Sequence, residues 1–277
     1  ADREAILSVH VKLKPLAEDV NLRVIAERTP GFSGADLYSL MNEGAIIAAR
    51  EGRKSVAQYD LIRSIEKVML GPERKSHVLS QKEKKITAYH EAGHALVASV
   101  LPDADPVHKI SIIARGSAGG YTLKLPLDER RLMSRATFLD DIAMSLGGYV
   151  AEKEIFGDIT TGPSNDLEVA TNMARQMVTR YGMSTLGPVA FVPDNESIRG
   201  VYNKEYSEVY GEKIDDEVKR IMDEAWNRAR LIVIEKRHVL TAIAEELMRV
   251  ENIEREDFEK ILVMHGIAPK RKEEGVA

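Results

Sequence analysis

The chain has 277 residues, which is more than one small domain needs and predicts two domains. Its formal net charge of -5 argues against a nucleic-acid-binding domain, because no long basic cluster is present to neutralise phosphates. Cysteine is absent, so disulfides, thiolate catalysis and zinc ribbons are excluded, and any metal site must use His, Asp or Glu. Aromatic residues make up only 5%, which favours packed helices over a β-sandwich.

Neither a membrane span nor a targeting segment is visible. No run of about 18 uninterrupted apolar residues exists, so the chain as given is not expected to cross a membrane. The first residues, Ala1-Asp2-Arg3-Glu4, have no signal-peptide pattern and no initial Met, so we expect a fragment of a longer protein.

The first quarter of the chain, from Asp19 to about Leu70, is predicted to form helices joined by short turns. Apolar residues at helical spacing indicate helices over 21–28, from about 34 to 52, and over 56–70. Ser33 or Gly34 is expected to cap the second of these. Gly71-Pro72 ends the third and marks the expected domain boundary, near residue 75.

The second part begins with Ser80-Gln81-Lys82-Glu83, a capping box that predicts a helix to about Val100. A run rich in β-branched residues at 107–113 and a second run at 121–125 flank a glycine-rich turn at 116–120 and indicate a pair of strands. Further helices are expected over about 134–156, 165–181, within 202–236 and over 255–265. The fold class is therefore mainly α, with a small β-ribbon.

One motif in the predicted helix after Ser80 has catalytic chemistry, the HExxH arrangement His90-Glu91-Ala92-Gly93-His94. Positions four apart project from the same helix face, so the two imidazoles can bind one zinc ion. Glu91 can then act as general base on the water that zinc activates. The alternative is a pair of histidines hydrogen-bonded in a core, but two His and a Glu in a largely apolar helix are costly without a partner.

A catalytic zinc also needs a third protein ligand. The metzincin extension is excluded, because Val97 and Val100 occupy the positions where that class has Gly and His. Two later carboxylates remain as candidates: Glu152, in the middle of a predicted helix, and Asp166, at a helix start after a turn rich in Thr, Gly and Pro. Such a turn can be shaped around a site, whereas a mid-helix Glu often has only a salt-bridge role. The residues alone therefore lean to Asp166, and alanine at 166, but not at 152, is expected to lower bound zinc; the alternative for Asp166 is an ordinary first-turn acid.

Several motifs in order carry a resemblance to a known family. HEAGH at 90–94, Gly120-Tyr121-Thr122, Leu146-Gly147-Gly148 and the stretch from Thr160 to Glu168 closely resemble the peptidase domain of the FtsH family, membrane-anchored AAA metalloproteases. Upstream, TPGFSGADL at 29–37 resembles the sensor-2 region of an AAA ATPase lid, which FtsH proteins carry just before the peptidase. The resemblance covers nearly the whole chain.

The resemblance implies a six-subunit, ATP-driven, processive zinc endopeptidase that degrades membrane and unfolded cytosolic proteins. It implies that His90, His94 and Asp166 bind one zinc ion and that Glu91 activates water, and it favours Asp166 over Glu152 as the third ligand. It also implies an exposed edge strand beside the zinc, which binds extended peptides through main-chain hydrogen bonds and consists of Gly120, Tyr121, Thr122 and Leu123.

Three points in this region stay open. The strand at 120–123 could instead belong to a hairpin that only packs. Asn165 could either orient a ligand or cap a helix together with Glu168. The family usually has Leu where this chain has Gly119, and this departure leaves the flexibility of the strand edge at 120–123 open.

The same resemblance implies three parts: residues 1–75 as a helical AAA lid, 76–270 as the zinc metallopeptidase domain with its β-ribbon, and 271–277 as a charged tail. No GxxxxGK[ST] loop is present, so ATP and Mg²⁺ are expected only in an ATPase core outside this chain. The expected location is the inner (plasma) membrane of a bacterium, with this domain soluble on the cytoplasmic side. Membrane contact would come only from a preceding segment.

The expected partners are polypeptide substrates and identical subunits in a hexameric ring, with no nucleic acid. Two other classes of function remain as alternatives: a zinc domain that assembles rings without turnover, and a helical adaptor that binds a partner through its C-terminal helices. Casein digestion would separate the first from a peptidase, and absence of zinc would favour the second.

Overall fold

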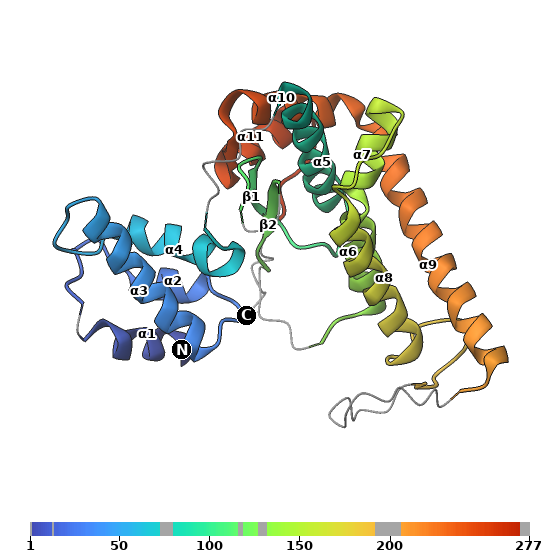
Figure 1. Cartoon of the computed structure of the whole chain (residues 1–277), viewed down its shortest axis with the longest axis horizontal. Coiled ribbons are helices and arrows are strands. Elements are labelled where there is room, and N and C mark those ends of the chain that lie inside the picture. The colour runs from blue at the N-terminus through green and yellow to red at the C-terminus, as the bar shows by residue number, and fades with distance from the viewer. Residues whose placement is uncertain are drawn as a thin grey trace. The chain divides into compact units, whose positions relative to one another are not determined.

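The computed structural model describes residues 2–12, 14–72, 80–115, 119–126, 132–191 and 206–271. It confirms a mainly α fold with a small sheet (Figure 1). The chain divides into two compact units, one formed by residues 1–78 with 113–118 and the other by 79–112 with 119–277. Among the described residues, no helix is long and apolar enough to cross a membrane.

The described residues of the first unit form four helices around their own core, coloured blue to cyan in Figure 1: α1 (Asp2–Val11), α2 (Leu22–Glu27), α3 (Gly34–Arg50) and α4 (Gln58–Leu70). Helix α3 starts at the predicted cap, because the Ser33 hydroxyl accepts a hydrogen bond from the Asp36 N–H and the Asp36 carboxylate accepts one from the Ser33 N–H. Helix α4 ends at Gly71, whose φ of 83° suits glycine. Helix α1 was not among the predicted elements.

This unit also includes the segment that follows the first strand of the chain. Arg115 and Glu66 are both buried there, and their side chains form an ion pair at 3.0 Å. Such a pair needs both partners, since either charge alone would be left in an apolar surrounding.

The second unit contains seven helices and three short strands among its described residues: α5 (Gln81–Val100), β1 (Val107–Ser111), β2 (Tyr121–Lys124), α6 (Arg135–Ser145), α7 (Gly147–Phe156), α8 (Ser164–Thr179), α9 (Glu208–Glu235), α10 (Arg237–Val250), β3 (Asn252–Glu254) and α11 (Arg255–Met264). The strands form an antiparallel sheet in the order β2-β1-β3. Ile110 of β1 lies opposite Thr122 of β2 and Ile253 of β3.

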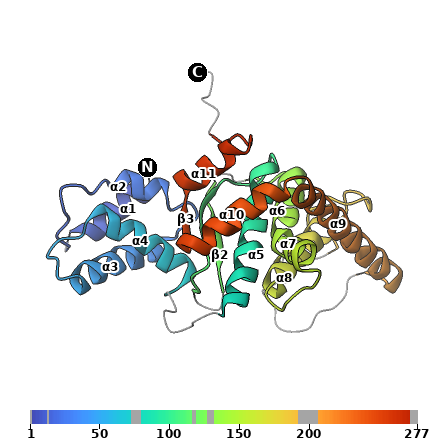
Figure 2. The same ribbon diagram turned by 90° about the horizontal axis from the view of Figure 1, so that it is seen from above.

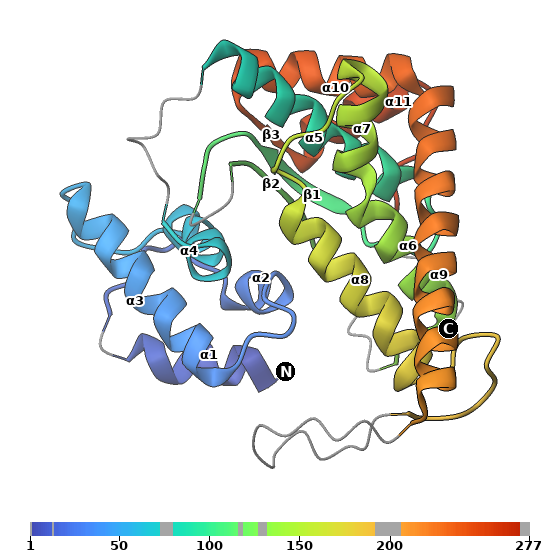
Figure 3. The same cartoon turned by 45° about the vertical axis from the view of Figure 1, so that its right-hand side comes forward.

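Helix α5 occupies the centre of this unit. It starts at the predicted Ser80 capping box with Glu83, and every residue from 88 to 98 is buried. Helices α7 and α10 pack along it, and α6, α9, β1 and β2 also contact it (Figures 2 and 3). A helix enclosed on this many sides can hold polar side chains only where they find partners.

The predicted single helix over 134–156 is wrong, since the structure has two helices there. Leu146 is at once the C-cap of α6 and the N-cap of α7, and α7 begins with Gly147 and Gly148. These glycines allow close packing: a Cβ at Gly147 would lie 2.7 Å from the carbonyl oxygen of Gly93 in α5. Two adjacent glycines also weaken a continuous helix, which explains the break.

Two elements of the second unit were not predicted, and both lie near its end. Helix α10 follows α9 directly after Lys236, and β3 adds a third strand to the expected pair. A three-residue strand has too little periodicity to be visible in a sequence. Part of the predicted turn at 116–120, residues 202–205 of the predicted long helix, and residues 272–277 of the tail lie outside the described residues.

Candidate active site

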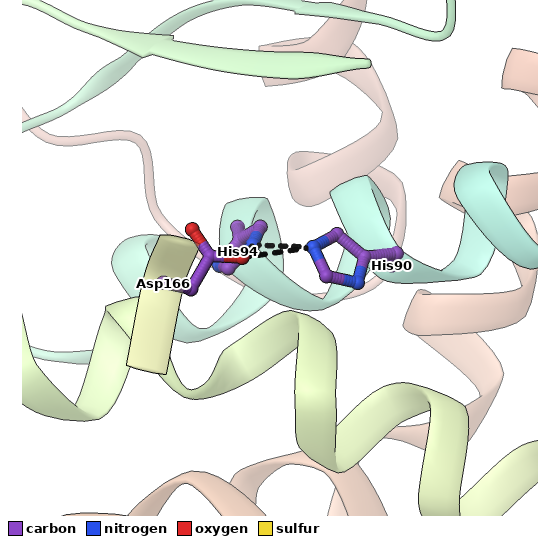
Figure 4. Close-up of side chains that lie close together, drawn as sticks. All are labelled: His90, His94 and Asp166. Carbon is purple, nitrogen blue, oxygen red and sulfur yellow. Dashed lines mark hydrogen bonds and ion pairs between the residues drawn. The ribbon is translucent and has the colours of Figure 1, made fainter. Parts of the chain in front are cut away.

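The two histidines of the HExxH motif and Asp166 come together in the second unit (Figure 4). His90 and His94 project from one face of α5, and their Nε2 atoms lie 3.0 Å apart. Asp166 lies in the first turn of α8, and its Oδ2 is 3.2 Å from His90 Nε2 and 3.4 Å from His94 Nε2. The fold thus joins three donor atoms from two helices that are far apart in sequence.

These distances fit one tetrahedral zinc ion. Ligand bonds of 2.0–2.1 Å at tetrahedral angles place neighbouring donor atoms about 3.3 Å apart. The three observed separations of 3.0, 3.2 and 3.4 Å bracket that value. Asp166 is partly exposed, so solvent reaches this side of the triad, as the open fourth position of a catalytic site requires.

Hydrogen bonds at the outer ring nitrogens orient both imidazoles. His94 Nδ1 lies 2.8 Å from the carbonyl oxygen of Met144, which can only accept, so Nδ1 carries the proton. His90 Nδ1 lies 2.8 Å from Oε1 of Glu152 and donates to that carboxylate. In the neutral rings both Nε2 lone pairs then point toward the Asp166 carboxylate. These three acceptor atoms repel one another unless a cation or a proton lies between them.

The pKa values of His90 and Asp166 both favour a positive charge at the imidazole beside an ionised carboxylate. Burial lowers the pKa of the His90 imidazole, but the hydrogen bonds to Asp166 and Glu152 outweigh burial and raise it to about 10. Burial also works to raise the pKa of the Asp166 carboxyl, yet the hydrogen bonds from His90 and His94 hold it well below its usual range. The site is therefore built to hold a cation against an ionised carboxylate.

Glu152 forms an ion pair, as a mid-helix glutamate often does, but its partner is the first histidine of the motif. The Glu152 side chain is 2% exposed, and its two oxygens have different partners. Oε1 accepts from His90, and Oε2 accepts from the backbone N–H of Thr160 at 2.8 Å. Glu152 thus links the His90 imidazole by hydrogen bonds to the loop that precedes Asp166. Burial opposes its ionisation, but the His90 hydrogen bond and the Thr160 N–H keep its pKa below the ordinary value.

Glycine is required where α7 passes the first histidine. A Cβ at Gly148 would lie 2.5 Å from the Nε2 and Cε1 atoms of His90, and one at Gly93 would lie 2.4 Å from the carbonyl oxygen of Gly147. No side chain can occupy such positions without moving the helices apart. The glycine pair of the Leu146-Gly147-Gly148 motif therefore lets α7 bring Glu152 within reach of His90.

Glu91, the predicted general base, is buried beside the histidines with 6% of its surface exposed. Its Oε2 accepts a hydrogen bond from the Thr122 hydroxyl at 2.8 Å. Burial raises the pKa of the Glu91 carboxyl, while the two imidazoles oppose that effect. A carboxylate with a raised pKa is a better proton acceptor near neutral pH.

The predicted substrate strand lies at the edge of the sheet. Strand β2 pairs with β1 and has no other strand beside it among the described residues. It contains Tyr121, Thr122 and Leu123, with Gly120 just before it, and of these Thr122 contacts Glu91 directly. The Thr122 hydroxyl and the carbonyl of Met144 had no signal in the sequence, because their roles depend only on which side chain lies opposite.

Asn165 does not cap α8. The N-cap is Pro163, which offers no side-chain hydrogen bond, and Asn165 is exposed inside the first turn. The turn before the helix is held instead by hydrogen bonds from the Thr160 N–H to Glu152 and from the Gly162 N–H to the Thr160 hydroxyl. These bonds fix the approach of the chain to Asp166.

Comparison with known proteins gives two family matches, which follow each other along the chain. Peptidase family M41 matches residues 77–261, and the AAA+ lid domain matches residues 19–62. The chain is 48% identical over 264 residues to the ATP-dependent zinc metalloprotease FtsH 1 of Thermoanaerobacter sp., covering 94% of this chain and 43% of that protein.

Other curated proteins agree with these matches. The chain is 50% identical over 266 residues to FtsH 1 of Sphaerobacter thermophilus, covering 94% of this chain and 41% of that protein. It is 48% identical over 257 residues to FtsH of Veillonella parvula, covering 91% and 40%. Both carry the name ATP-dependent zinc metalloprotease. The chain spans less than half the length of these relatives.

Proposed function

Because the chain belongs to peptidase family M41, we propose that His90, His94 and Asp166 bind one zinc ion and that the site hydrolyses peptide bonds. The observation that carries the proposal is the convergence of three donor atoms 3.0 to 3.4 Å apart, with both imidazoles oriented from behind by acceptors. When bound, zinc supplies a Lewis acid that makes water nucleophilic near neutral pH and polarises the scissile carbonyl.

Glu91 performs the proton transfers. Its carboxylate takes the proton from the attacking water and later gives it to the leaving amine, so that one residue serves first as base and then as acid. Burial supports both steps, since the resulting shift of its pKa toward neutrality suits a group that must accept and release a proton in each turnover. The protein holds Asp166 ionised meanwhile, so the ligand does not compete for that proton.

Strand β2 is the proposed substrate site. Its outer main-chain groups lie at the edge of the sheet, where an extended peptide can add as a further strand. Gly120, Tyr121, Thr122 and Leu123 form this edge, next to Glu91 through the Thr122 contact. Recognition through main-chain hydrogen bonds predicts weak dependence on substrate sequence.

For the longer protein, we propose an ATP-dependent processive protease in which this chain supplies the lid and the peptidase. Residues 1–75 would form the AAA lid, 76–270 the peptidase domain and 271–277 a charged tail, with ATP and Mg²⁺ bound in an ATPase core outside this chain. A hexameric ring, anchored in a bacterial inner membrane with this part on the cytoplasmic side, would degrade membrane and unfolded cytosolic proteins. The names of the relatives and the lid match support the ATP dependence.

The decisive variant is Glu91→Gln, tested on the zinc-loaded chain with an unfolded protein such as casein. It is expected to retain one zinc per chain, because Glu91 is not among the three converging ligands. Peptidase activity should fall by at least ~100-fold, the usual contribution of a general base. Full activity in this variant would refute the role of Glu91, and a wild-type chain that binds no zinc would refute the metal site.

A further inference from the structure

The carboxylate of the proposed base has a single hydrogen-bond donor within the described part of the chain. That donor is the Thr122 hydroxyl, which lies 2.8 Å from Glu91 Oε2 and 3.2 Å from the main-chain carbonyl oxygen of Glu91. The contact links α5 to β2 across 31 residues of sequence. Hydrogen bonds to a charged acceptor are the stronger ones, so the carboxylate is the preferred partner of this hydroxyl.

The strand also shapes the other side of the carboxylate. Side chains alternate along a strand, so positions 120 and 122 share one face of β2, while Tyr121 and Leu123 are directed to the other. A Cβ at Gly120 would lie 2.8 Å from Glu91 Oε1. The carboxylate therefore lies against β2 between a glycine that leaves room for one oxygen and a threonine that binds the other.

The two oxygens of the Glu91 carboxylate therefore have different roles. Oε2 is occupied by Thr122, whereas no described residue donates a hydrogen bond to Oε1. A base must keep one oxygen free to receive a proton and must hold it within hydrogen-bond reach of the water. A buried glutamate without a fixed hydrogen-bond partner would instead populate several rotamers, and its free oxygen would no longer be held within reach of the water.

Resting on the proposed function, we propose that Thr122 is a positioning residue, whose hydroxyl holds the Glu91 carboxylate in the orientation that proton transfer requires. The same strand residue takes part in peptide binding through its main chain. The strand edge that binds the substrate therefore also orients the Glu91 carboxylate. Loss of the hydroxyl should slow the chemical step and leave zinc and peptide binding in place.

The test compares three substitutions in the zinc-loaded 277-residue chain, with a short fluorogenic peptide as substrate. Thr122→Val removes the hydroxyl and keeps the shape, and it should lower kcat by ~10- to 100-fold with KM within ~3-fold of the wild type. Thr122→Ser keeps the hydroxyl and should restore kcat to within ~3-fold. Thr179→Val is the matched control: its buried hydroxyl donates to the Arg175 carbonyl in α8, away from the site.

Two measurements other than turnover separate positioning from damage. Zinc stoichiometry of Thr122→Val should equal that of the wild type. In the inactive Glu91→Gln background, adding Thr122→Val should leave the Kd of the same peptide unchanged, as measured by fluorescence anisotropy. If Thr122→Val does not fold, Thr122→Ala replaces it, since the smaller side chain fits the same space.

The outcomes are distinct. Wild-type kcat in Thr122→Val, or failure of Thr122→Ser to restore activity, would overturn the positioning role even if Glu91→Gln is inactive. A loss of zinc or a weakened peptide Kd in Thr122→Val would also overturn it, in favour of a structural role. Full activity of Glu91→Gln would instead refute the proposed function itself, so the two failures can be told apart.

Discussion

Glu152→Gln tests the inference that this residue holds the first zinc ligand in place. The glutamate accepts two hydrogen bonds, one from His90 Nδ1–H and one from the Thr160 N–H, each at 2.8 Å. A glutamine side chain has one acceptor oxygen, so one of the two donors would face an NH₂ group. The substitution preserves the volume of the buried side chain, so the effect isolates the lost acceptor.

The expected cost follows from these contacts. A hydrogen bond to a charged group is worth about 1.5–3 kcal/mol, and loss of such a partner behind a metal ligand typically weakens metal binding by ~10- to 100-fold. At about 1.4 kcal/mol for each factor of ten, the two figures agree. We therefore expect Glu152→Gln to bind zinc ~10- to 100-fold more weakly than the wild type. This revises the expectation that position 152 does not affect zinc.

Competition with a fluorescent zinc chelator at pH 7 measures the affinity directly. The matched control is Glu154→Gln, two residues further along α7, where the carboxylate pairs at 2.6 Å with a partly exposed Arg230. That variant should stay within ~2-fold of the wild type, because surface ion pairs contribute little. A Glu152→Gln affinity within the same ~2-fold range, in a folded protein, would refute the reasoning.

Three further predictions concern other parts of the second unit. Asp166→Ala removes a ligand outright and should lower zinc affinity more than Glu152→Gln does, in the same chelator assay. Gly93→Ala places a Cβ 2.4 Å from the Gly147 carbonyl oxygen and should lower the free energy of unfolding by about 1–3 kcal/mol in urea titrations. Hydrogen bonds from Arg220 hold the pKa of Glu217 at about 2, below its ordinary 4.5. Because the folded pKa is the lower one, Glu217→Gln should cost about 1–2 kcal/mol at pH 7, and the difference from the wild type should disappear as the pH falls from 4.5 to 2.

Each of these has a clear contrary result. Unchanged zinc affinity in Asp166→Ala would remove that residue from the ligand set. A Gly93→Ala protein as stable as the wild type would mean that α5 and α7 can separate without cost. A Glu217→Gln deficit that persists at pH 2, followed by circular dichroism in urea, would show that the effect is packing and not charge.

Much of the fold and part of the site could be predicted from the sequence, because those features are local. The Ser80 capping box and the spacing of His90 and His94 are set by neighbouring residues on one helix, whose geometry is known in advance. The absence of cysteine likewise restricted any metal site to His, Asp and Glu. The break at Leu146 is local too, since Gly147 and Gly148 weaken a continuous helix, and the expectation of a single helix over 134–156 overlooked that signal.

The remaining contacts were decided only by the tertiary structure. Asp166 meets His90 across 76 residues, Glu152 reaches the same imidazole across 62, and Thr122 reaches Glu91 across 31. The sequence by itself determined which side chains could bind a metal and which could transfer a proton. It left open whether Glu152 or Asp166 joins the histidines, because two helical carboxylates differ in neither charge nor chemistry. Their distances from His90 are set by the packing of α7 and α8 around α5, and no local rule of chain geometry contains that information.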